Sequence, residues 1–347
     1  MILRLVMIGF GNVGQEFARL LLRKKEWLVK SKGLEIEVLA VATKSKGSLV
    51  SKRALDLERV LKLLSEKGTL KDYGPELTNM SPIEIIDSTE ADLMVELTPL
   101  NIDTGQPAID HIKAAFDVSM DVVTANKGPV ALEYRALRSH ARSRGVHFRF
   151  EGTVMDGTPI FNLVEKTLPG CEILGVEGIL NSTSNFVLTE MRNGSSMEDA
   201  VKEAQRRGFA EADPGLDIDG WDAAAKITAL ANVLMDADAK PIDVERTGIR
   251  DVTKRKLDEA ASAGSRIRLV AKAVREGDKV RLSVAPESVP PSSVYWSLEG
   301  TSSAVTIKTD LMGDLTIVET DPIVTQTAYA VLSDILLVVE SIRAGVP

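Results

Sequence analysis

The sequence lacks the residues and patterns that would indicate a disulfide scaffold, a zinc centre or a membrane segment. Its 347 residues include one cysteine, Cys171, so no disulfide bond can form within the chain. Neither CxxC nor HExxH occurs, which disfavours a zinc site. No apolar run approaches the roughly 18 residues of a membrane span, and the N-terminus does not show the pattern of a signal peptide. We therefore expect a cytoplasmic protein with no membrane partner.

Charge and length narrow the class further. The net charge is -8 at pH 7, and no run of Lys and Arg interleaves with aromatic residues. Such a balance argues against a nucleic acid partner. A chain of this length exceeds one ordinary hydrophobic core, so we expect two domains.

The N-terminus carries the pattern of a dinucleotide site. An apolar strand is predicted at residues 2–8 and a helix from Gln15 to Lys25. Between them lies a G-x-G-x-x-G turn, whose glycines allow backbone N–H groups to approach a pyrophosphate closely. Its residues are Gly9, Phe10, Gly11, Asn12, Val13 and Gly14. Strands and helices alternate up to about residue 150, which predicts an α/β fold with a Rossmann-type, doubly wound parallel sheet.

The end of the second predicted strand, residues 35–42, bears on the choice of cofactor. A NAD-binding fold usually places an acidic residue there for the ribose 2′-hydroxyl. This chain has Thr43 and Lys44 instead, with Arg53 downstream. Cations and hydroxyls suit a 2′-phosphate, so we expect NADP(H) to be preferred over NAD(H). The alternative is that these basic residues form only a solvated loop.

Other candidate residues follow the later strands. Strands predicted at 91–97 and 121–125 end at Thr98 and at Asn126-Lys127. Ligands of parallel α/β sheets bind beyond the carboxyl ends of strands, so these residues are candidates for the cofactor edge. From residue 151 the pattern changes to mixed strands and helices. We expect residues 1–150 with about 318–347 to form the dinucleotide-binding domain, and residues 151–317 an α+β substrate-binding and dimerisation domain.

An acidic segment at residues 208–226 is the most distinctive part of that second domain. Asp219 is predicted to cap a helix that begins near Gly220. Asp222 and Lys226 are four residues apart and share one face of that helix. Carboxylates beside a lysine suit a small substrate that carries an ammonium group and gains or loses a proton. The alternative is a solvated surface pair, which contributes little.

Four segments together resemble homoserine dehydrogenase in its short monofunctional form. They are the glycine turn, residues 96–130 with their Asn-Lys-Gly-Pro motif, residues 180–189, and the acidic segment at 208–226. The resemblance implies a nicotinamide-dependent interconversion of L-homoserine and L-aspartate 4-semialdehyde, a step of threonine and methionine biosynthesis. It also implies a homodimer.

The resemblance assigns roles to individual residues. Lys226 and Lys127 would handle the proton of the alcohol. Glu211 and Asp222 would hold the substrate ammonium with support from Asp217. The substrate carboxylate would lie near Thr183 and Ser182, and the nicotinamide near Thr98 and Lys127.

The resemblance also implies a monovalent cation, Na⁺, held by oxygen atoms. Its ligands would be the Glu151 side chain and the carbonyls of Val154, Asp156 and Thr158. The alternative is a tight turn in which Glu151 caps backbone amides.

Two departures from the family pattern keep other functions open. Ser182 stands where the family often has glycine, and the glycine-rich loop expected before the last helix is replaced by residues 318–324 with Glu319 and Asp321. The alternatives are a related amino-acid dehydrogenase with an altered pocket, or a non-catalytic sensor of dinucleotide and amino acid. The presence of both Lys127 and Lys226 argues against the sensor, which needs no proton-transfer group.

Overall fold

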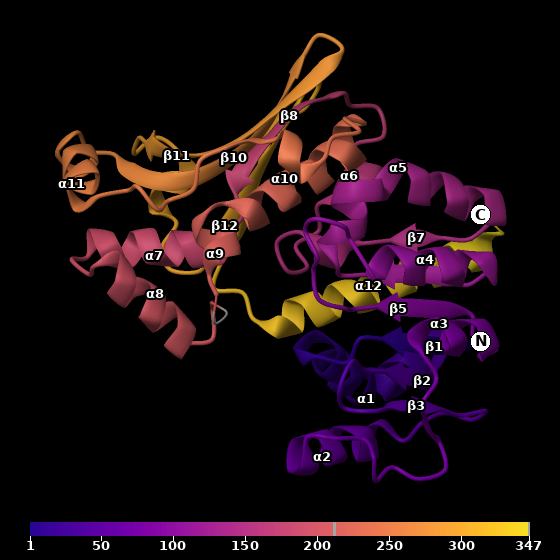
Figure 1. Ribbon diagram of the computed structural model, residues 1–347. Coiled ribbons are helices and arrows are strands. Elements are labelled where there is room, and N and C mark those ends of the chain that lie inside the picture. Colours follow the sequence, from indigo (N-terminus) through magenta and orange to yellow (C-terminus); the bar gives the residue numbers. More distant parts are fainter. Residues whose placement is uncertain (211–212, 346–347) are drawn as a thin grey trace. The chain divides into compact units, whose positions relative to one another are not determined.

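The computed structural model describes residues 1–210 and 213–345, which form two compact units. One unit holds Met1–Pro159 together with residues 323–345, and the other holds Ile160–Pro322. The chain therefore crosses between units after Pro159 and after Pro322, slightly beyond the positions expected from the sequence. Figure 1 shows the course of the chain through both units.

A seven-stranded sheet forms the centre of the first unit, in the order β4-β3-β2-β1-β5-β6-β7. Its strands are β1 (Ile2–Ile8), β2 (Glu35–Ala42), β3 (Ser48–Val50), β4 (Leu77–Thr78), β5 (Leu93–Glu96), β6 (Asp121–Thr124) and β7 (Phe148–Arg149). Five neighbouring strands of the sheet pair in parallel, as predicted; they are β2, β1, β5, β6 and β7. The short strands β3 and β4 add an antiparallel edge that the sequence analysis did not predict.

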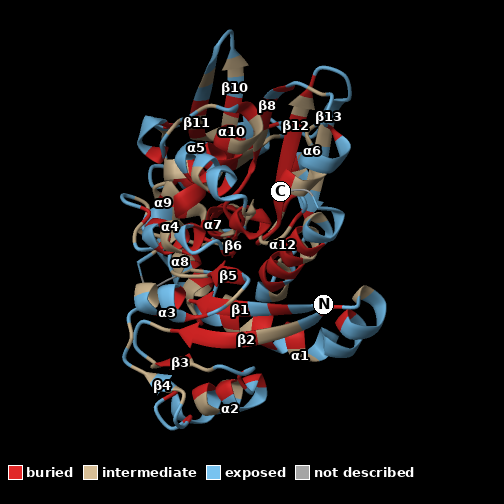
Figure 2. Ribbon diagram, turned by 90° about the vertical axis from the view of Figure 1, so that its right-hand side faces the viewer, coloured by how far each residue is buried: buried red, intermediate tan, exposed pale blue. Residues whose placement is uncertain are grey.

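Helices cover both faces of this sheet. On one face lie α1 (Asn12–Lys32), α2 (Leu57–Lys67) and α12 (Val324–Ala344); on the other lie α3 (Pro82–Ser88), α4 (Ala108–Asp117) and α5 (Lys127–Arg144). Alternation along β1 explains the two cores: Leu5 and Met7 belong to the first, and Val6 and Ile8 to the second. A strand buried on both faces must be apolar throughout, and Figure 2 shows this burial along the central strands.

The second unit contains a six-stranded sheet in the order β13-β12-β8-β10-β11-β9. Its strands are β8 (Ile173–Ile179), β9 (Glu245–Arg246), β10 (Arg266–Glu276), β11 (Lys279–Val289), β12 (Ser303–Thr309) and β13 (Gly313–Glu319). Its helices are α6 (Phe161–Thr167), α7 (Ser182–Arg192), α8 (Met197–Arg206), α9 (Gly215–Ile218), α10 (Trp221–Met235) and α11 (Lys254–Ser262). Helix α10 packs against β8, β10 and β11, and α7 packs against β10. The strands β12 and β13 were not predicted.

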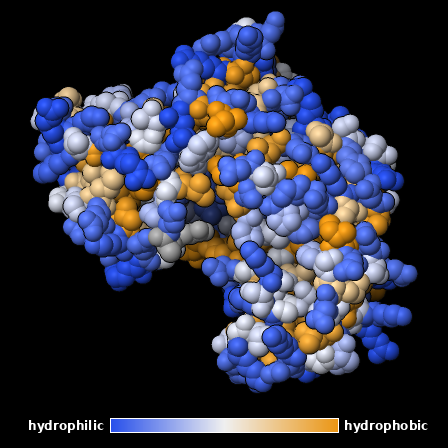
Figure 3. Space-filling view, viewed as in Figure 1, coloured by the Kyte–Doolittle hydropathy of each residue, from blue (hydrophilic) through white to orange (hydrophobic). Residues whose placement is uncertain are grey.

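The surface and the helices bear on the membrane question. Figure 3 shows hydrophilic side chains over most of the visible face, with apolar side chains in separate groups. Among the described residues, no helix combines the length and the apolar character needed to cross a bilayer.

Candidate active site

The glycine turn joins β1 to α1 with the geometry of a phosphate-binding site. Gly9 has φ 95°, and a Cβ atom there would lie 2.5 Å from the carbonyl carbon of Leu97, so only glycine fits. Gly14 packs close to Gly9, because a Cβ atom would lie 3.0 Å from the Gly9 oxygen. Gly11 is the N-cap of the 21-residue helix α1, and Asn12 is exposed beside it. The cap has no side chain and the first turn is uncharged, so the amides and the positive end of the helix dipole suit an anion.

The other two residues of the turn differ in their surroundings. Phe10 is 2% exposed and belongs to the apolar core beneath the turn. Val13 is half-buried in the first turn of α1. Any contribution of Phe10 to a cofactor site would therefore come from its backbone.

A basic loop follows β2 beside this turn. The Gly9 amide donates to the Ala42 carbonyl at 3.0 Å, which places the two strand ends together. The Thr43 hydroxyl donates to the Gly47 carbonyl at 2.7 Å and accepts from the Lys46 amide at 2.8 Å. Thr43 thus shapes the loop, while Lys44 is exposed, as is Arg53 further along the chain.

The carboxyl ends of β5 and β6 form the adjoining edge of the sheet. Asn126 is the N-cap of α5, its side-chain oxygen accepting from the Gly128 amide at 3.0 Å, so Lys127 is the first residue of the helix. The Asn126 amide group donates to the Thr98 carbonyl at 2.9 Å. Strands β2 and β5 flank β1 on opposite sides, so this edge is a topological switch point. The structure thus brings Gly9, Thr98 and Lys127 to one edge.

The acidic segment and α7 meet in the second unit. The side-chain amide of Asn181 donates to Asp217 Oδ1 at 2.6 Å and to Asp222 Oδ2 at 2.9 Å. Lys226 Nζ lies 3.0 Å from Asp222 Oδ2 and donates to the Leu180 carbonyl at 2.7 Å. The side chains of Lys226 and Asp222 are only 15% and 13% exposed. The alternative of a solvated surface pair is therefore wrong.

The environment of Asp217 differs from that of a surface carboxylate. Burial raises its pKa above the ordinary value, and the nearby charge of Asp222 adds to this rise. The hydrogen bond from Asn181 and the charge of Lys226 oppose the rise without cancelling it. A cation bound beside such a carboxylate stabilises its ionised form, and this is the property expected of a site for a substrate ammonium.

Two further predicted residues lie at the start of α7. Thr183 is 5% exposed, and its hydroxyl donates to the Phe209 carbonyl at 3.0 Å. The Ser182 hydroxyl lies 3.4 Å from that of Ser303. Glu211, the remaining predicted ligand of the ammonium, lies outside the described residues.

One prediction in this segment is wrong and one residue was missed. Asp219 does not cap α10: the N-cap is Gly220, at φ 79°, and Asp219 pairs with Arg250 at 2.8 Å. That hydrogen bond lowers the pKa of Asp219. Asn181, which joins both carboxylates and caps α7 through the Ser184 amide at 2.7 Å, was not assigned a role. Its place between an apolar strand and a Ser-Thr-Ser run is a recognisable N-cap signal.

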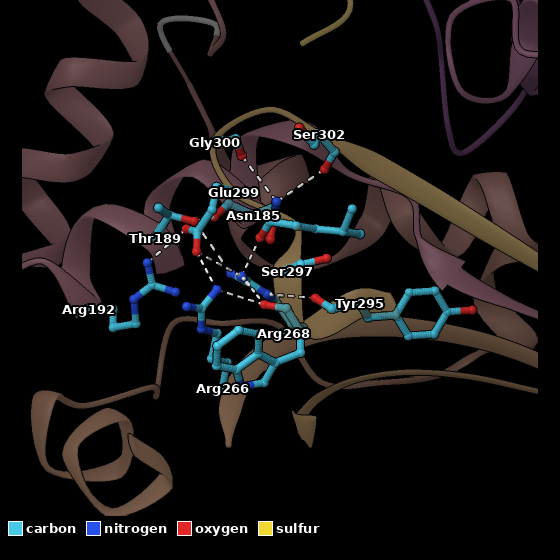
Figure 4. A network of polar contacts seen from close by, with 12 residues as sticks. Asn185, Thr189, Arg192, Arg266, Arg268, Tyr295, Ser297, Glu299, Gly300 and Ser302 are labelled. Atoms are coloured by element: carbon cyan, nitrogen blue, oxygen red, sulfur yellow. Dashed lines mark hydrogen bonds and ion pairs between the residues drawn. The ribbon is translucent and has the colours of Figure 1, made fainter. Parts of the chain in front are cut away.

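An arginine network holds the segment that leads to Ser303, the residue whose hydroxyl lies beside that of Ser182. Figure 4 shows this network around Arg268 and Glu299. Arg268 is 1% exposed and donates to backbone carbonyls of η3 (Val294–Ser297) and the residue after it, including that of Tyr295 at 3.3 Å. Burial lowers the pKa of Arg268 to about 10. Asn185 donates to the carbonyls of Gly300 and Ser302, both at 3.1 Å. These bonds fix the chain just before Ser303.

The predicted cation ligands lie on one turn after β7. They are Glu151, Val154, Asp156 and Thr158. All are buried except Asp156, which is half-buried; Asp156 has φ 54° and Met155 φ 48°. Helix α12 holds this turn: Asp334 Oδ2 accepts from the Glu151 amide at 2.8 Å, and Thr327 donates to Asp156 at 3.2 Å. A Cβ atom on Gly157 would lie 2.3 Å from the Gln326 oxygen, so the turn and α12 are in close contact.

Comparison with known proteins identifies the family. Residues 159–336 match the family model for homoserine dehydrogenase, and residues 9–151 match the model for the homoserine dehydrogenase NAD binding domain. The chain belongs to the homoserine dehydrogenase family. Members of this family are NAD(P)-dependent oxidoreductases that act on a CH–OH group, which confirms the resemblance seen in the sequence.

Individual homoserine dehydrogenases are similar over nearly the whole chain. The protein from Methanocaldococcus jannaschii is 38% identical over 98% of this chain and 99% of its own length. A NAD(+)-dependent homoserine dehydrogenase from Pseudomonas canavaninivorans is 34% identical over 97% of this chain and 96% of its own. A hyperthermophilic archaeal homoserine dehydrogenase in complex with NADPH has a TM-score of 0.84 at 28% identity, covering 98% of each chain.

The segment where this chain departs from the family pattern contains the second crossing between units. Glu319 ends β13 and is buried, and Asp321 adopts φ 44°, a conformation that glycine takes most readily. The Thr301 hydroxyl donates to Asp321 at 3.4 Å. The loop therefore contains a left-handed residue although it has no glycine.

Proposed function

We propose that the chain catalyses the NAD(P)-dependent interconversion of L-homoserine and L-aspartate 4-semialdehyde, as in threonine and methionine biosynthesis. The observation that carries this proposal is the largely buried cluster of Asn181, Asp217, Asp222 and Lys226. It combines carboxylates that can bind an ammonium group with a lysine that can donate or accept a proton. Family membership and the glycine turn supply the rest of the argument.

Each group of the substrate has a proposed partner. Asp217 and Asp222, with Glu211, hold the ammonium by charge. The carboxylate lies at the start of α7, where Ser182, Thr183 and the positive end of the helix dipole favour an anion. Bound nicotinamide supplies or accepts the hydride. The fit of the glycine turn to a pyrophosphate supports this cofactor.

Proton transfer is assigned to two lysines that belong to different units, Lys226 and Lys127. In the reductive direction a charged lysine polarises the aldehyde and donates the proton; in the oxidative direction a neutral lysine accepts it. Thr98 and Lys127 are proposed to border the nicotinamide.

The choice of NADP(H) over NAD(H) is a separate proposal. Exposed Lys44 supports it, because its loop lies beside the glycine turn. Arg53 is exposed as well, but the chain on either side of it bonds to Leu39 and Val38, further back along β2. The NAD(+)-dependent relative from Pseudomonas canavaninivorans represents the other outcome. Comparison of the catalytic efficiency with NADP⁺ and NAD⁺, in the wild type and in Lys44→Ala, decides between them.

Three further assignments complete the proposal. A Na⁺ ion at the turn of residues 151–158 would be held mainly by carbonyls, since no group of three or more acidic, His or Cys side chains suited to a metal is found among the described residues. The chain is proposed to act as a homodimer in the cytoplasm. Light scattering of the purified protein tests the homodimer, and activity with and without Na⁺ tests the ion.

The deciding experiment mixes purified protein with L-homoserine and NADP⁺ or NAD⁺ and follows the absorbance of the reduced coenzyme. The variant Lys226→Ala should lower kcat by roughly 10²–10⁴. The matched control is Lys202→Ala, because Lys202 forms the same i,i+4 pair with Glu198 but is 64% exposed. Full activity of Lys226→Ala at saturating homoserine would remove the lysine from the mechanism.

Two negative results point to the alternatives. Turnover of another amino alcohol, but not of homoserine, would indicate a related dehydrogenase with an altered pocket. Tight binding of coenzyme and homoserine without turnover would indicate a sensor. In either case the loop at Glu319–Asp321 becomes the first region to examine.

A further inference from the structure

Glu96 is a buried carboxylate that the proposed reaction does not use. It ends β5 and is 0% exposed. One carboxylate oxygen accepts from the Thr98 amide at 2.9 Å and from the Thr98 hydroxyl, and the other accepts from the Thr124 hydroxyl at 2.9 Å. His111 Nδ1, from α4, lies 4.0 Å from the first oxygen. A buried carboxylate is tolerated only when donors hold it in this way.

These bonds commit the polar atoms of Thr98 to the protein. Its amide and its hydroxyl both face Glu96, and its carbonyl accepts from Asn126. The single hydroxyl proton of Thr98 is therefore already donated to Glu96. Thr98 acts as a fixed part of the edge, and Glu96 is the group that fixes it.

The same carboxylate connects three strand ends. The Thr124 hydroxyl accepts from the backbone N–H of Asn126 at 3.0 Å. This bond fixes the N-cap of α5 and therefore the position of Lys127, the first residue of that helix. The peptide after Leu97 lies against Gly9, where a Cβ atom would come within 2.8 Å of the Thr98 nitrogen. Glu96 thus ties the end of β5 to those of β6 and β1, the edge where the nicotinamide half of a dinucleotide is expected.

We propose that Glu96 is a positioning residue for the nicotinamide half of the cofactor. It acts through Thr98 and through Asn126 with its neighbour Lys127, and it touches neither cofactor nor substrate. The inference rests on the proposed dinucleotide-dependent function. It predicts that loss of the carboxylate harms the nicotinamide end of the site and spares the adenosine end, which lies against the glycine turn.

The test compares two ligands and two substitutions. Glu96→Leu removes every acceptor, whereas Glu96→Gln keeps one oxygen for the Thr98 amide and offers its amide to the Thr124 hydroxyl, which can rotate. Glu96→Leu should raise the dissociation constant of the reduced coenzyme about tenfold, as expected for lost hydrogen bonds. It should leave that of the matching fragment without nicotinamide, 2′,5′-ADP or ADP, unchanged. Glu96→Gln should restore most of the affinity.

A matched control is available in the same sheet. Asp121 is a second buried carboxylate, 7% exposed, but it lies at the amino end of β6 and binds the His147 amide and ring at 2.7 and 2.9 Å. Asp121→Leu should lower the thermal midpoint without changing the affinity of either ligand. Should Glu96→Leu fail to fold, Thr98→Val removes the hydroxyl that donates a hydrogen bond to Glu96. It tests the same weakening of coenzyme binding without a change in the binding of the fragment.

The outcomes separate this inference from the proposed function. Wild-type protein that binds coenzyme but does not turn over homoserine rejects the function, and the ligand comparison still stands. Equal weakening of coenzyme and fragment in Glu96→Leu, or the same pattern in Asp121→Leu, would show a merely structural role. Wild-type affinity in both Glu96→Leu and Thr98→Val, or no binding of either coenzyme by the wild type, would also overturn the inference.

Discussion

The amide of Asn181 should be the most sensitive single group of the proposed substrate site. It caps α7 and donates to two carboxylates that would otherwise repel each other. Loss of an N-cap costs about 1 kcal/mol of unfolding free energy, and each hydrogen bond to a charged group contributes roughly 1.5 kcal/mol. We therefore expect Asn181→Ala to lower the free energy of unfolding by about 3 kcal/mol, because these contributions are only partly additive.

A matched variant isolates the part that comes from the carboxylates. Ser196 caps α8 by accepting from the Asp199 amide at 3.1 Å. Its hydroxyl also donates to the exposed Asp199 carboxylate at 2.6 Å, and within the described part of the chain it makes no hydrogen bond to Asp217 or Asp222. Ser196→Ala should cost about 1 kcal/mol. The difference between the two variants, measured by urea unfolding, reports the bonds to Asp217 and Asp222. Asn181→Asp, which keeps a capping oxygen but adds a third carboxylate, should be no better than Asn181→Ala.

Activity gives an independent reading of the same perturbation. Without the amide, the pKa of Asp217 rises further, since its hydrogen bond from Asn181 lowers that pKa. Fewer carboxylates are then ionised to hold the ammonium, so KM for homoserine should increase in Asn181→Ala. Equal unfolding costs in Asn181→Ala and Ser196→Ala, together with an unchanged KM, would refute the reasoning.

Three further predictions concern acidity, the arginine network and the turn before the first crossing. Burial raises the pKa of Asp217, so kcat/KM for homoserine should fall as pH decreases through that raised value, and Asp217→Asn should abolish this step in the pH profile. Because the pKa of Asp217 is higher in the folded than in the unfolded protein, its ionisation lowers the free energy of unfolding, which should therefore be higher at low pH. Arg268→Met leaves buried carbonyls without donors and should cost about 3 kcal/mol in urea unfolding, whereas Arg255→Met, at a side chain 83% exposed, should change it by less than about 0.5 kcal/mol. Gly157→Ala places a methyl group within 2.3 Å of the Gln326 oxygen and should lower the thermal midpoint by several degrees, about 1–3 kcal/mol of overpacking; an unchanged midpoint would contradict the contact.

The parallel half of the fold was predictable because its signals are local. A strand buried on both faces is a continuous apolar run, and the glycine turn follows β1 directly, so the order strand, turn and helix could be predicted over residues 2–25. The helix itself is longer than predicted, since α1 runs from Asn12 to Lys32. The antiparallel edge of β3 and β4 was missed because these strands have three and two residues. The strand β12 was missed since Ser303–Thr309 is buried on both sides without alternation, and its pairing with β8 is a long-range choice.

The site residues show the same division between local and long-range information. The i,i+4 relation of Asp222 and Lys226 follows from helix geometry alone. The link from Asn181 to Asp217 joins residues 36 positions apart and requires the fold. Asp219 was misplaced because an acidic residue before a helix resembles an N-cap, while Gly220 takes the left-handed conformation that ends α9 and starts α10.

The position of α12 has a consequence for the order in which the protein is made. This helix completes the first core, where Val331, Ile335 and Val338 pack with residues of α1 and β1. In the chain, however, it follows the whole of Ile160–Pro322. During synthesis the apolar face of the first unit that α12 covers therefore stays exposed until the second unit has left the ribosome. A nascent chain halted before Val324 should thus bind a chaperone that captures exposed apolar surface, and release should coincide with emergence of α12.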